Sequence, residues 1–205
     1  MARPKTFDED AALMRAMELF WEHGYSAASL TQLTACMGIN RQSLYDTYGD
    51  KRGLFLKALD RYSGLIGGRL LASLSTEAPW LNEIKATIAA LIGFLVEFPK
   101  PRACLMANTA MEIARHDQTV ADKVQAFHRT LEDAFEVALR NARHRREIAS
   151  TADLPALAKY LVSVANGMAA TAKAGATKQN LRDIAGVALT ALQPTPTHSA
   201  ARKQP

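Results

Sequence analysis

A chain of 205 residues with 48% hydrophobic and 22% charged residues has the size and composition of a globular protein of one domain or two small ones. The net charge of +5 would suit a nucleic-acid partner, but residues 1–52 contain six Lys or Arg against seven Asp or Glu. Bulk charge therefore does not identify a DNA-binding domain there. No apolar run reaches the roughly eighteen residues of a membrane span, and MARPKTFDED lacks a signal-peptide core, so we expect a cytoplasmic protein.

The first helix is predicted to open at Thr6, which has capping-box spacing with Glu9, and to end at Gly24. Ahead of it, Arg3 and Lys5 belong either to a basic arm that reaches DNA or to an ordinary frayed terminus.

Two short helices separated by a tight turn follow in the stretch SLTQLTACMGINRQSLYDTYGD. Ser29 and Gln32 form a capping box at the start of the first helix. Gly38 is placed to stop it, because glycine reaches the left-handed conformation without a Cβ penalty, and Asn40 is a strong N-cap for the second helix, residues 41–48. This is the helix-turn-helix pattern, in which the second helix enters the major groove of DNA.

The second helix carries side chains suited to nucleic-acid contacts, while Leu44 is predicted to point to the core. Arg and Gln are bidentate partners of guanine and adenine edges, Ser reads either, and Tyr donates to phosphate. The residues predicted to face outward are Arg41, Gln42, Ser43, Tyr45, Asp46 and Thr47. A glycine-stopped helix before a capped helix also occurs in proteins that never meet DNA, so spacing alone leaves the function open.

Residues 11–54 resemble the DNA-binding domain of the TetR family of bacterial one-component repressors. The residues that carry the resemblance are Ala16, Leu19, Phe20, Gly24, Tyr25, Thr31, Leu33, Gly38, Ile39, Ser43, Leu44, Tyr45, Tyr48, Lys51 and Leu54. The resemblance implies a homodimer that binds a palindromic operator, and a Lys51 that contacts phosphate at a helix start capped by Asp50. The candidate DNA-binding residues are Ser29, Thr31, Asn40, Arg41, Gln42, Ser43, Tyr45, Asp46, Tyr48 and Lys51.

The middle of the chain is predicted to form further helices from residue 51 onward, with breaks after residue 73 and at residues 99–102. A helix over residues 103–115 precedes one that is capped by Asp117 and ends in a basic cluster at residues 140–146. That cluster is either a solvated helix end or a second nucleic-acid patch.

By resemblance, the middle helices surround a pocket for a small-molecule effector. The candidate lining residues are Trp80, Phe94, Phe98, Cys104, Met106, Asn108, Met111, Glu112, Phe127 and Phe135. Most of them are equally well explained as core, and Asn108 and Glu112 share a helix face that is either buried against a partner or ligand or lies at an exposed edge.

Two cysteines form neither a disulfide framework nor a zinc-site spacing. Cys104 follows Arg102 at a predicted helix start, where the helix and the cation would lower the thiol pKa. An alternative function is therefore a redox or electrophile sensor acting through Cys104; otherwise Cys104 is a small buried apolar residue, as is Cys36.

The last two helices, predicted after Asp153 and over residues 178–192, are rich in small residues, and the resemblance implies that they form a four-helix bundle across a two-fold axis. The candidate dimer-interface residues are Leu157, Leu161, Val164, Met168, Leu181, Ile184, Ala188 and Leu192. The tail over residues 194–205 is predicted to be disordered.

The sequence contains no catalytic motif, no P-loop and no His or Cys cluster with metal-ligand spacing, so we expect no enzyme activity, cofactor or metal. A helical adaptor without DNA contacts is the remaining alternative. We predict an all-α, ligand-released repressor with a helix-turn-helix domain at residues 1–50 and a ligand-binding and dimerisation domain at residues 51–193, without membrane contact.

Overall fold

The structure, a computed structural model, describes residues 7–74, 80–97 and 103–193. Within these ranges the chain is all-helical, which confirms the predicted fold class. The helices are α1 (Glu9–His23), α2 (Leu30–Met37), α3 (Arg41–Tyr48), α4 (Lys51–Ser73), α5 (Trp80–Glu97), α6 (Leu105–Glu112), α7 (Gln118–His144), α8 (Leu154–Lys173) and α9 (Lys178–Thr190). None of these helices is long and apolar enough to cross a lipid bilayer.

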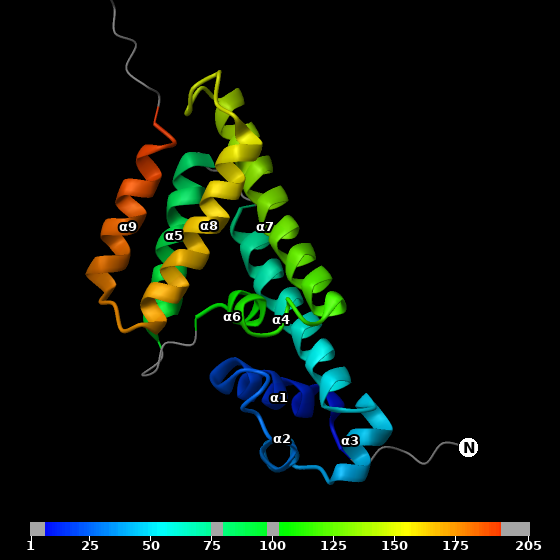
Figure 1. Cartoon of the computed structure of the whole chain (residues 1–205). Helices are drawn as coiled ribbons and strands as arrows, with labels where there is room; N and C mark the ends of the chain where they lie inside the picture. The colour runs from blue at the N-terminus through cyan, green and yellow to red at the C-terminus, as the bar shows by residue number, and fades with distance from the viewer. Residues whose placement is uncertain (1–6, 75–79, 98–102, 194–205) are drawn as a thin grey trace, which may run out of the picture.

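The helices are arranged as a small head and a larger body (Figure 1). The head consists of α1, α2 and α3, and the body contains α5 to α9. Helix α4 starts in the head, where it packs on α1 and α3, and continues into the body, where it packs on α7. A displacement of α4 in the body therefore has a direct route to the head.

The core of the head is formed by large side chains that are fully buried. Phe20 of α1 packs edge-to-face on Phe55 of α4 with ring centroids 4.9 Å apart. Leu33 of α2 and Leu44 of α3 are both 0% exposed, which confirms the predicted inward position of Leu44. Burial of these side chains fixes the angle between α2 and α3.

Local capping accounts for the helix boundaries in the head. The Ser29 hydroxyl accepts from the Gln32 N–H at 3.2 Å, and the Ser29 N–H donates to Gln32 Oε1 at 2.9 Å, which confirms the predicted capping box. Gly38 adopts φ 70° and ψ 31°, the left-handed conformation expected of a helix stop. Asn40 Oδ1 accepts from the Ser43 N–H at 2.8 Å and caps α3.

Helix α1 begins later than predicted. It starts at Glu9, and Asp8 is its N-cap, with Oδ1 accepting from the N–H groups of Asp10 and Ala11 at 3.0 and 3.1 Å. Asp8 is therefore the cap, in place of the predicted Thr6. Thr6 itself, the arm with Arg3 and Lys5, and the tail from residue 194 lie outside the described residues.

Helix α6 is shorter than the predicted helix over residues 103–115. Ala103 has φ 56°, which an α-helix does not accommodate, and Cys104 is the N-cap without a side-chain capping bond. The helix over Leu105–Glu112 is thus a separate short element packed on α7. Helix α9 likewise ends at Thr190, before the predicted Leu192.

The body is organised around the long helix α7. Asp117 caps it by accepting from the Val120 N–H at 3.2 Å, and Asp153 caps α8 by accepting from the Ala156 N–H at 3.1 Å, both as predicted. Helix α7 packs on α4, α5, α6 and α8, and α9 packs on α5 and α8. At the end of α7, Arg140 pairs with Glu136 at 2.6 Å.

Candidate functional site

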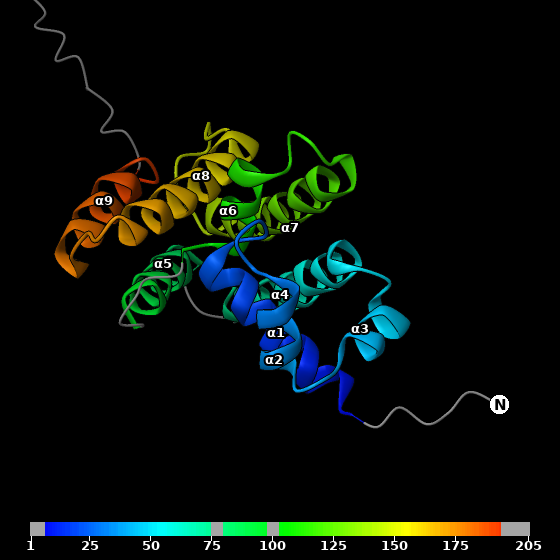
Figure 2. The same ribbon diagram turned by 60° about the horizontal axis from the view of Figure 1, so that its bottom comes forward.

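The outer face of α3 is the candidate surface for reading DNA. Arg41, Gln42, Tyr45 and Asp46 are exposed there, with Tyr45 43% exposed. Helix α3 lies at the end of the head far from α9 in both Figure 1 and Figure 2, so the body does not obstruct this face. The position and polarity of α3 fit a recognition helix.

Side-chain hydrogen bonds orient the polar groups of this face. Arg41 Nη2 donates to Thr31 Oγ1 at 3.1 Å, and Gln42 Nε2 donates to Asp46 Oδ1 at 2.7 Å. These contacts join exposed groups and can be exchanged for contacts with base edges or phosphates at little cost. Thr31 and Asp46 thus hold Arg41 and Gln42 in defined orientations on the reading face.

The other predicted DNA-binding residues have additional structural contacts. Ser29 and Asn40 are helix caps, and Ser43 is half-buried. The Tyr48 hydroxyl donates to the carbonyl of Glu9 at 3.4 Å, so Tyr48 helps to close the head around α1.

Lys51 takes part in a group of contacts between the body and the head, which we call the junction cluster: Tyr25, Ser26, Lys51 and Glu112. Lys51 Nζ donates to the Ser26 carbonyl at 3.4 Å and lies 4.6 Å from the centroid of the Tyr25 ring. Burial lowers the pKa of Lys51 below its ordinary value, although the nearby Glu112 carboxylate opposes this shift.

Glu112, the last residue of α6, connects the body to the turn between α1 and α2. Its Oε2 accepts from the Tyr25 N–H at 2.9 Å, and its Oε1 accepts from the Ser26 N–H at 2.7 Å. Burial alone would raise the pKa of Glu112, but the hydrogen bonds from Ser26 and Tyr25 and the Lys51 charge lower it overall. The carboxylate therefore stays ionised and holds two backbone donors of the head.

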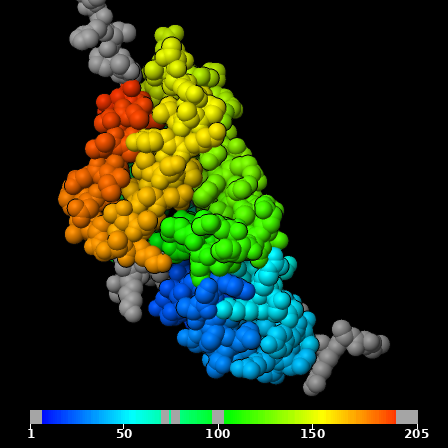
Figure 3. All heavy atoms as spheres, viewed as in Figure 1, coloured from blue at the N-terminus to red at the C-terminus, as the bar shows by residue number. Residues whose placement is uncertain are grey.

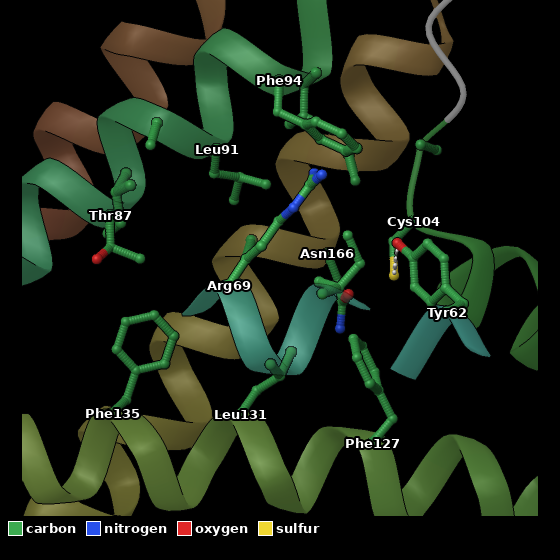
Figure 4. Close-up of a pocket in the computed structure, with 17 residues that line it drawn as sticks. Tyr62, Arg69, Thr87, Leu91, Phe94, Cys104, Phe127, Leu131, Phe135 and Asn166 are labelled. Atoms are coloured by element: carbon green, nitrogen blue, oxygen red, sulfur yellow. Dashed lines mark hydrogen bonds between the residues drawn. The ribbon is translucent and has the colours of Figure 1, made fainter. Parts of the chain in front are cut away.

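A cavity of about 270 Å³ lies inside the body between α4, α5, α7 and α8 (Figure 4). Its described lining residues are mostly apolar, with a few polar groups. They are Tyr62, Ile66, Arg69, Thr87, Ile88, Ala90, Leu91, Phe94, Leu95, Ala103, Cys104, Phe127, Leu131, Phe135, Ala165, Asn166 and Ala169. A partly open apolar cavity with few polar groups is typical of a small-molecule site.

Four of the predicted lining residues reach this cavity: Phe94, Cys104, Phe127 and Phe135. Met106, which is buried core, and Met111, which is 72% exposed, do not line it. Trp80, Asn108 and Glu112 are also absent from the wall. Asn108 accepts from Lys173 Nζ at 3.3 Å, and Glu112 binds the head instead. Phe98 lies outside the described residues.

The sequence reasoning missed a face of α4 that contributes to the wall. Tyr62, Ile66 and Arg69 line the cavity at spacings of four and three residues, the signal that would have identified them. On α8, Asn166 also lines the cavity, and its Nδ2 lies 3.2 Å from His128 Nε2.

The head touches the cavity wall through Trp21 of α1. The indole Nε1–H donates to the Ala103 carbonyl at 2.7 Å. The indole ring stacks on Phe94 with centroids 5.7 Å apart and meets Tyr62 edge-on at 5.1 Å. Three lining residues are thus in direct contact with a single side chain of the head.

Cys104 faces the cavity beside Tyr62, whose hydroxyl donates to the sulfur at 3.6 Å. Burial raises the pKa of the Cys104 thiol. The expectation that a helix start and a cation lower this pKa is therefore wrong, because desolvation outweighs the backbone N–H groups near the sulfur. Arg102, the expected cation, lies outside the described residues.

Helices α8 and α9 lie side by side at the surface of the body (Figure 3). Large apolar side chains are exposed on them: Tyr160 at 39%, Ile184 at 37% and Val187 at 71%. Of the predicted dimer-interface residues, Leu157, Val164 and Ile184 are partly or largely accessible. The remaining five are buried within the protomer, although Ala188 also borders a surface depression between α8 and α9, and their place in a dimer interface stays a prediction: Leu161, Met168, Leu181, Ala188 and Leu192.

A capped helix-turn-helix joined to a hollow helical body defines a class of protein, the all-α DNA-binding regulators. The comparisons with known proteins agree. Residues 12–58 match the family of bacterial regulatory proteins designated tetR, and residues 81–186 match the tetracyclin repressor-like C-terminal domain.

Two relatives are similar over nearly the whole chain. The HTH-type transcriptional repressor ComR of Escherichia coli is 34% identical, with 91% of this chain and 90% of ComR covered. YezE of Bacillus subtilis, an uncharacterized HTH-type transcriptional regulator, is 36% identical, with 94% and 100% covered.

Among solved structures, a cysteine mutant of the TetR family transcriptional regulator CifR, complexed with 26-bp double-strand operator DNA, is 30% identical. It matches with a TM-score of 0.83 over 93% of this chain and 100% of that one. This chain belongs to the TetR family of transcriptional regulators. It is a DNA-binding regulator and not an enzyme.

Proposed function

We propose that the protein is a homodimeric repressor that binds a palindromic operator and leaves it when a small molecule occupies the cavity. The observation that carries this proposal is the hydrogen bond from Trp21 of the head to Ala103 in the cavity wall. Because the wall and the head share this contact, a ligand that moves the wall alters the position of α1. Binding to bacterial operator DNA would require a cytoplasmic protein, which is the location we propose.

The junction cluster supports a second route from the cavity to the head. Ala103 and Cys104 line the cavity and lead directly into α6, whose last residue, Glu112, holds the backbone of Tyr25 and Ser26. Lys51 donates to that same Ser26, so a shift of α6 would displace the proposed phosphate anchor together with the turn. The two binding equilibria are then linked: if the ligand weakens DNA binding by a given factor, DNA must weaken ligand binding by the same factor.

Exposed apolar residues on the last two helices support the homodimer. Tyr160 and Val164 of α8 border a shallow surface depression together with Ile184 and Val187 of α9. Apolar side chains gathered on a helix pair favour burial against a second copy, and a two-fold interface pairs the same patch on both subunits. A dimer of this kind would present two copies of α3 to two operator half-sites.

The first experiment is a selection from a randomised DNA duplex pool with the purified full-length protein at moderate salt. We expect a palindromic consensus, with Arg41→Ala relaxing base preference in each half-site at a cost of about 1–3 kcal/mol per contact. Lys51→Ala should weaken binding to all sequences alike and flatten the salt dependence. A folded, dimeric protein that enriches no sequence would contradict the proposal in favour of a helical adaptor.

We propose thiol sensing through Cys104 as the second candidate function, supported by the position of its sulfur in the cavity wall beside the Tyr62 hydroxyl. A protonated, buried thiol needs an electrophile that first binds in the cavity. The test compares wild type with Cys104→Ser for operator release after treatment with a quinone. Equal release by both proteins would eliminate this candidate.

A further inference from the structure

The cavity in the body has a single charged group in its described wall. Arg69 is that group, and the other polar residues are Tyr62, Thr87, Cys104 and Asn166. No carboxylate is among the described lining residues, so the wall itself does not balance the guanidinium charge.

Three titratable groups in or beside the wall, Tyr62, Cys104 and His128, are uncharged at neutral pH. Burial raises the pKa values of Tyr62 and Cys104, which keeps both protonated. Burial also lowers the pKa of His128, whose ring lies beside Asn166, so the imidazole is neutral near pH 7. The Glu132 carboxylate lies near His128 but outside the described wall, so Arg69 is the charge that a molecule would meet at the described wall itself.

The Arg69 side chain lies among apolar residues of the cavity wall. Figure 4 shows its side chain reaching from α4 toward Leu91 and Phe94, with Leu131 and Phe135 on the opposite side. Arg69 is itself exposed. A charged group that pairs with it therefore remains partly hydrated, which limits the desolvation cost of the ion pair.

We propose that the cavity binds a small monocarboxylic acid with an apolar body, its carboxylate paired with Arg69 and its hydrocarbon among Phe94, Leu131 and Phe135. The planar guanidinium matches a carboxylate through two parallel N–H donors. A cationic ligand would be repelled, and a neutral apolar ligand would gain nothing from Arg69. The inference rests on the proposed function, because it names the chemical class of the effector.

The volume limits the size of this acid. A cavity of about 150 Å³ lined by Leu, Ile and Phe holds one benzene molecule, and the cavity here measures about 270 Å³. The interior therefore accepts an apolar body on the order of ten carbon atoms. Arg69 lies near the C-terminal end of α4, and Lys51 is its first residue. An ion pair between the ligand carboxylate and Arg69 would therefore act on the helix that enters the head.

Two series of probes with matched apolar bodies test the charge requirement. One consists of 4-phenylbutanoate, 4-phenylbutanamide and 4-phenylbutylamine, and the other of octanoate, octanamide and octylamine. Binding is measured by calorimetric titration of the full-length dimer. In at least one series, the acid is expected to bind at least ten-fold more tightly than its amide, and the amine is expected to bind most weakly.

Two arginine variants distinguish an ion pair between the ligand and Arg69 from a general effect of the protein's positive charge. Arg69→Gln should abolish the preference for the acid while leaving the affinity for the amide within two-fold. Arg129→Gln, an exposed position on α7 outside the cavity wall, removes the same charge and should retain the preference. The Trp21 indole, which contacts Phe94 and Tyr62, provides a fluorescence readout of cavity occupancy in each variant.

The proposal is overturned if acid and amide bind wild type equally, if the preference survives in Arg69→Gln, or if neither acid binds at millimolar concentration. The same preparations are assayed for operator binding without ligand. A protein that binds its selected operator while both acids fail disproves the effector class and leaves the proposed function standing. Acid binding through Arg69 in a protein that enriches no DNA sequence disproves the regulatory function instead.

Discussion

The head buries the side chains at its centre completely, whereas the body keeps a space of about 270 Å³ among side chains of similar size. Phe20, Leu33 and Leu44 are all 0% exposed in the head, while Phe94 and Leu131 border the cavity of the body. A close-packed unit holds a fixed reading surface, and a hollow unit can be stabilised or reshaped by whatever fills it. This difference in packing suits the head to DNA recognition and the body to a response to a bound small molecule.

The largest expected effect is the loss of head packing in Leu44→Ala. Removal of this fully buried side chain from α3 should lower the free energy of unfolding by about 2–5 kcal/mol, measured by urea denaturation. Tyr45→Ala, the neighbouring exposed position, should change stability by no more than about 0.5 kcal/mol but weaken operator binding. Equal stability of the two variants would show that the head is not the close-packed unit inferred here.

The contrast between head and body also separates what the sequence predicts from what it leaves open. The caps Ser29 and Asn40 and the helix stop at Gly38 were predicted correctly, because each acts on residues within three or four positions. The positive φ of Ala103, which shortens α6, depends on tertiary packing and has no local signal.

The same reasoning explains the errors in the candidate sites. Glu112 meets Tyr25 across 87 positions of sequence, so periodicity identified a polar helix face but not its partner. The cavity draws its wall from four helices and the segment before α6, and helical spacing alone does not distinguish Met106 in the core from Phe127 at the wall. On α9, both faces carry apolar residues: Leu181 is buried within the protomer, whereas Ile184 and Val187 are exposed.

The second prediction tests the contact between head and body by comparing Gly24→Ala with Gly49→Ala. Both glycines have positive φ, 83° and 80°, so each alanine should cost about 1–3 kcal/mol through backbone strain. A Cβ at Gly24 would lie 2.8 Å from Glu112 Oε2, whereas a Cβ at Gly49 meets no atom within 4 Å. Gly24→Ala should therefore also displace the carboxylate from its two backbone donors.

Amide hydrogen exchange distinguishes the two effects. Exchange at the Tyr25 and Ser26 N–H groups should accelerate in Gly24→Ala and stay at the wild-type rate in Gly49→Ala, which serves as the strain control. The same acceleration in both variants would mean that backbone strain, and not the displaced Glu112, loosens the turn.

A smaller effect is expected from Glu112→Gln, which keeps the shape of the side chain. The amide has one acceptor oxygen for two N–H donors and no charge beside Lys51, so the loss should be about 0.5–1.5 kcal/mol. Ligand-induced release from the operator should weaken, because α6 no longer holds the turn at Ser26. Glu22→Gln, an exposed position on α1, is the matched control. Unchanged release in Glu112→Gln would leave Trp21 as the main route from cavity to head.

The smallest effect concerns the ion pair between Arg52 of α4 and Asp117 at the start of α7. Arg52 Nε and Nη2 donate to the Asp117 carboxylate at 2.6 and 2.9 Å, and these bonds lower the pKa of Asp117 to about 2. The unfolded chain has an aspartate pKa of about 3.9. A depressed carboxyl pKa stabilises the fold above the unfolded value, so this contribution is complete above about pH 4 and is lost as pH falls toward about 2.

NMR titration of the Asp117 carboxyl should show its pKa rising toward the ordinary value in Arg52→Gln, while the melting temperature at pH 7 falls only slightly. The small change is expected because water and salt screen an ion pair at the protein surface. Ligand-induced operator release should survive in Arg52→Gln, since the junction cluster and Trp21 remain intact. A loss of release as large as that in Glu112→Gln would show that the body acts on the head equally through α7, and that α6 has no special role.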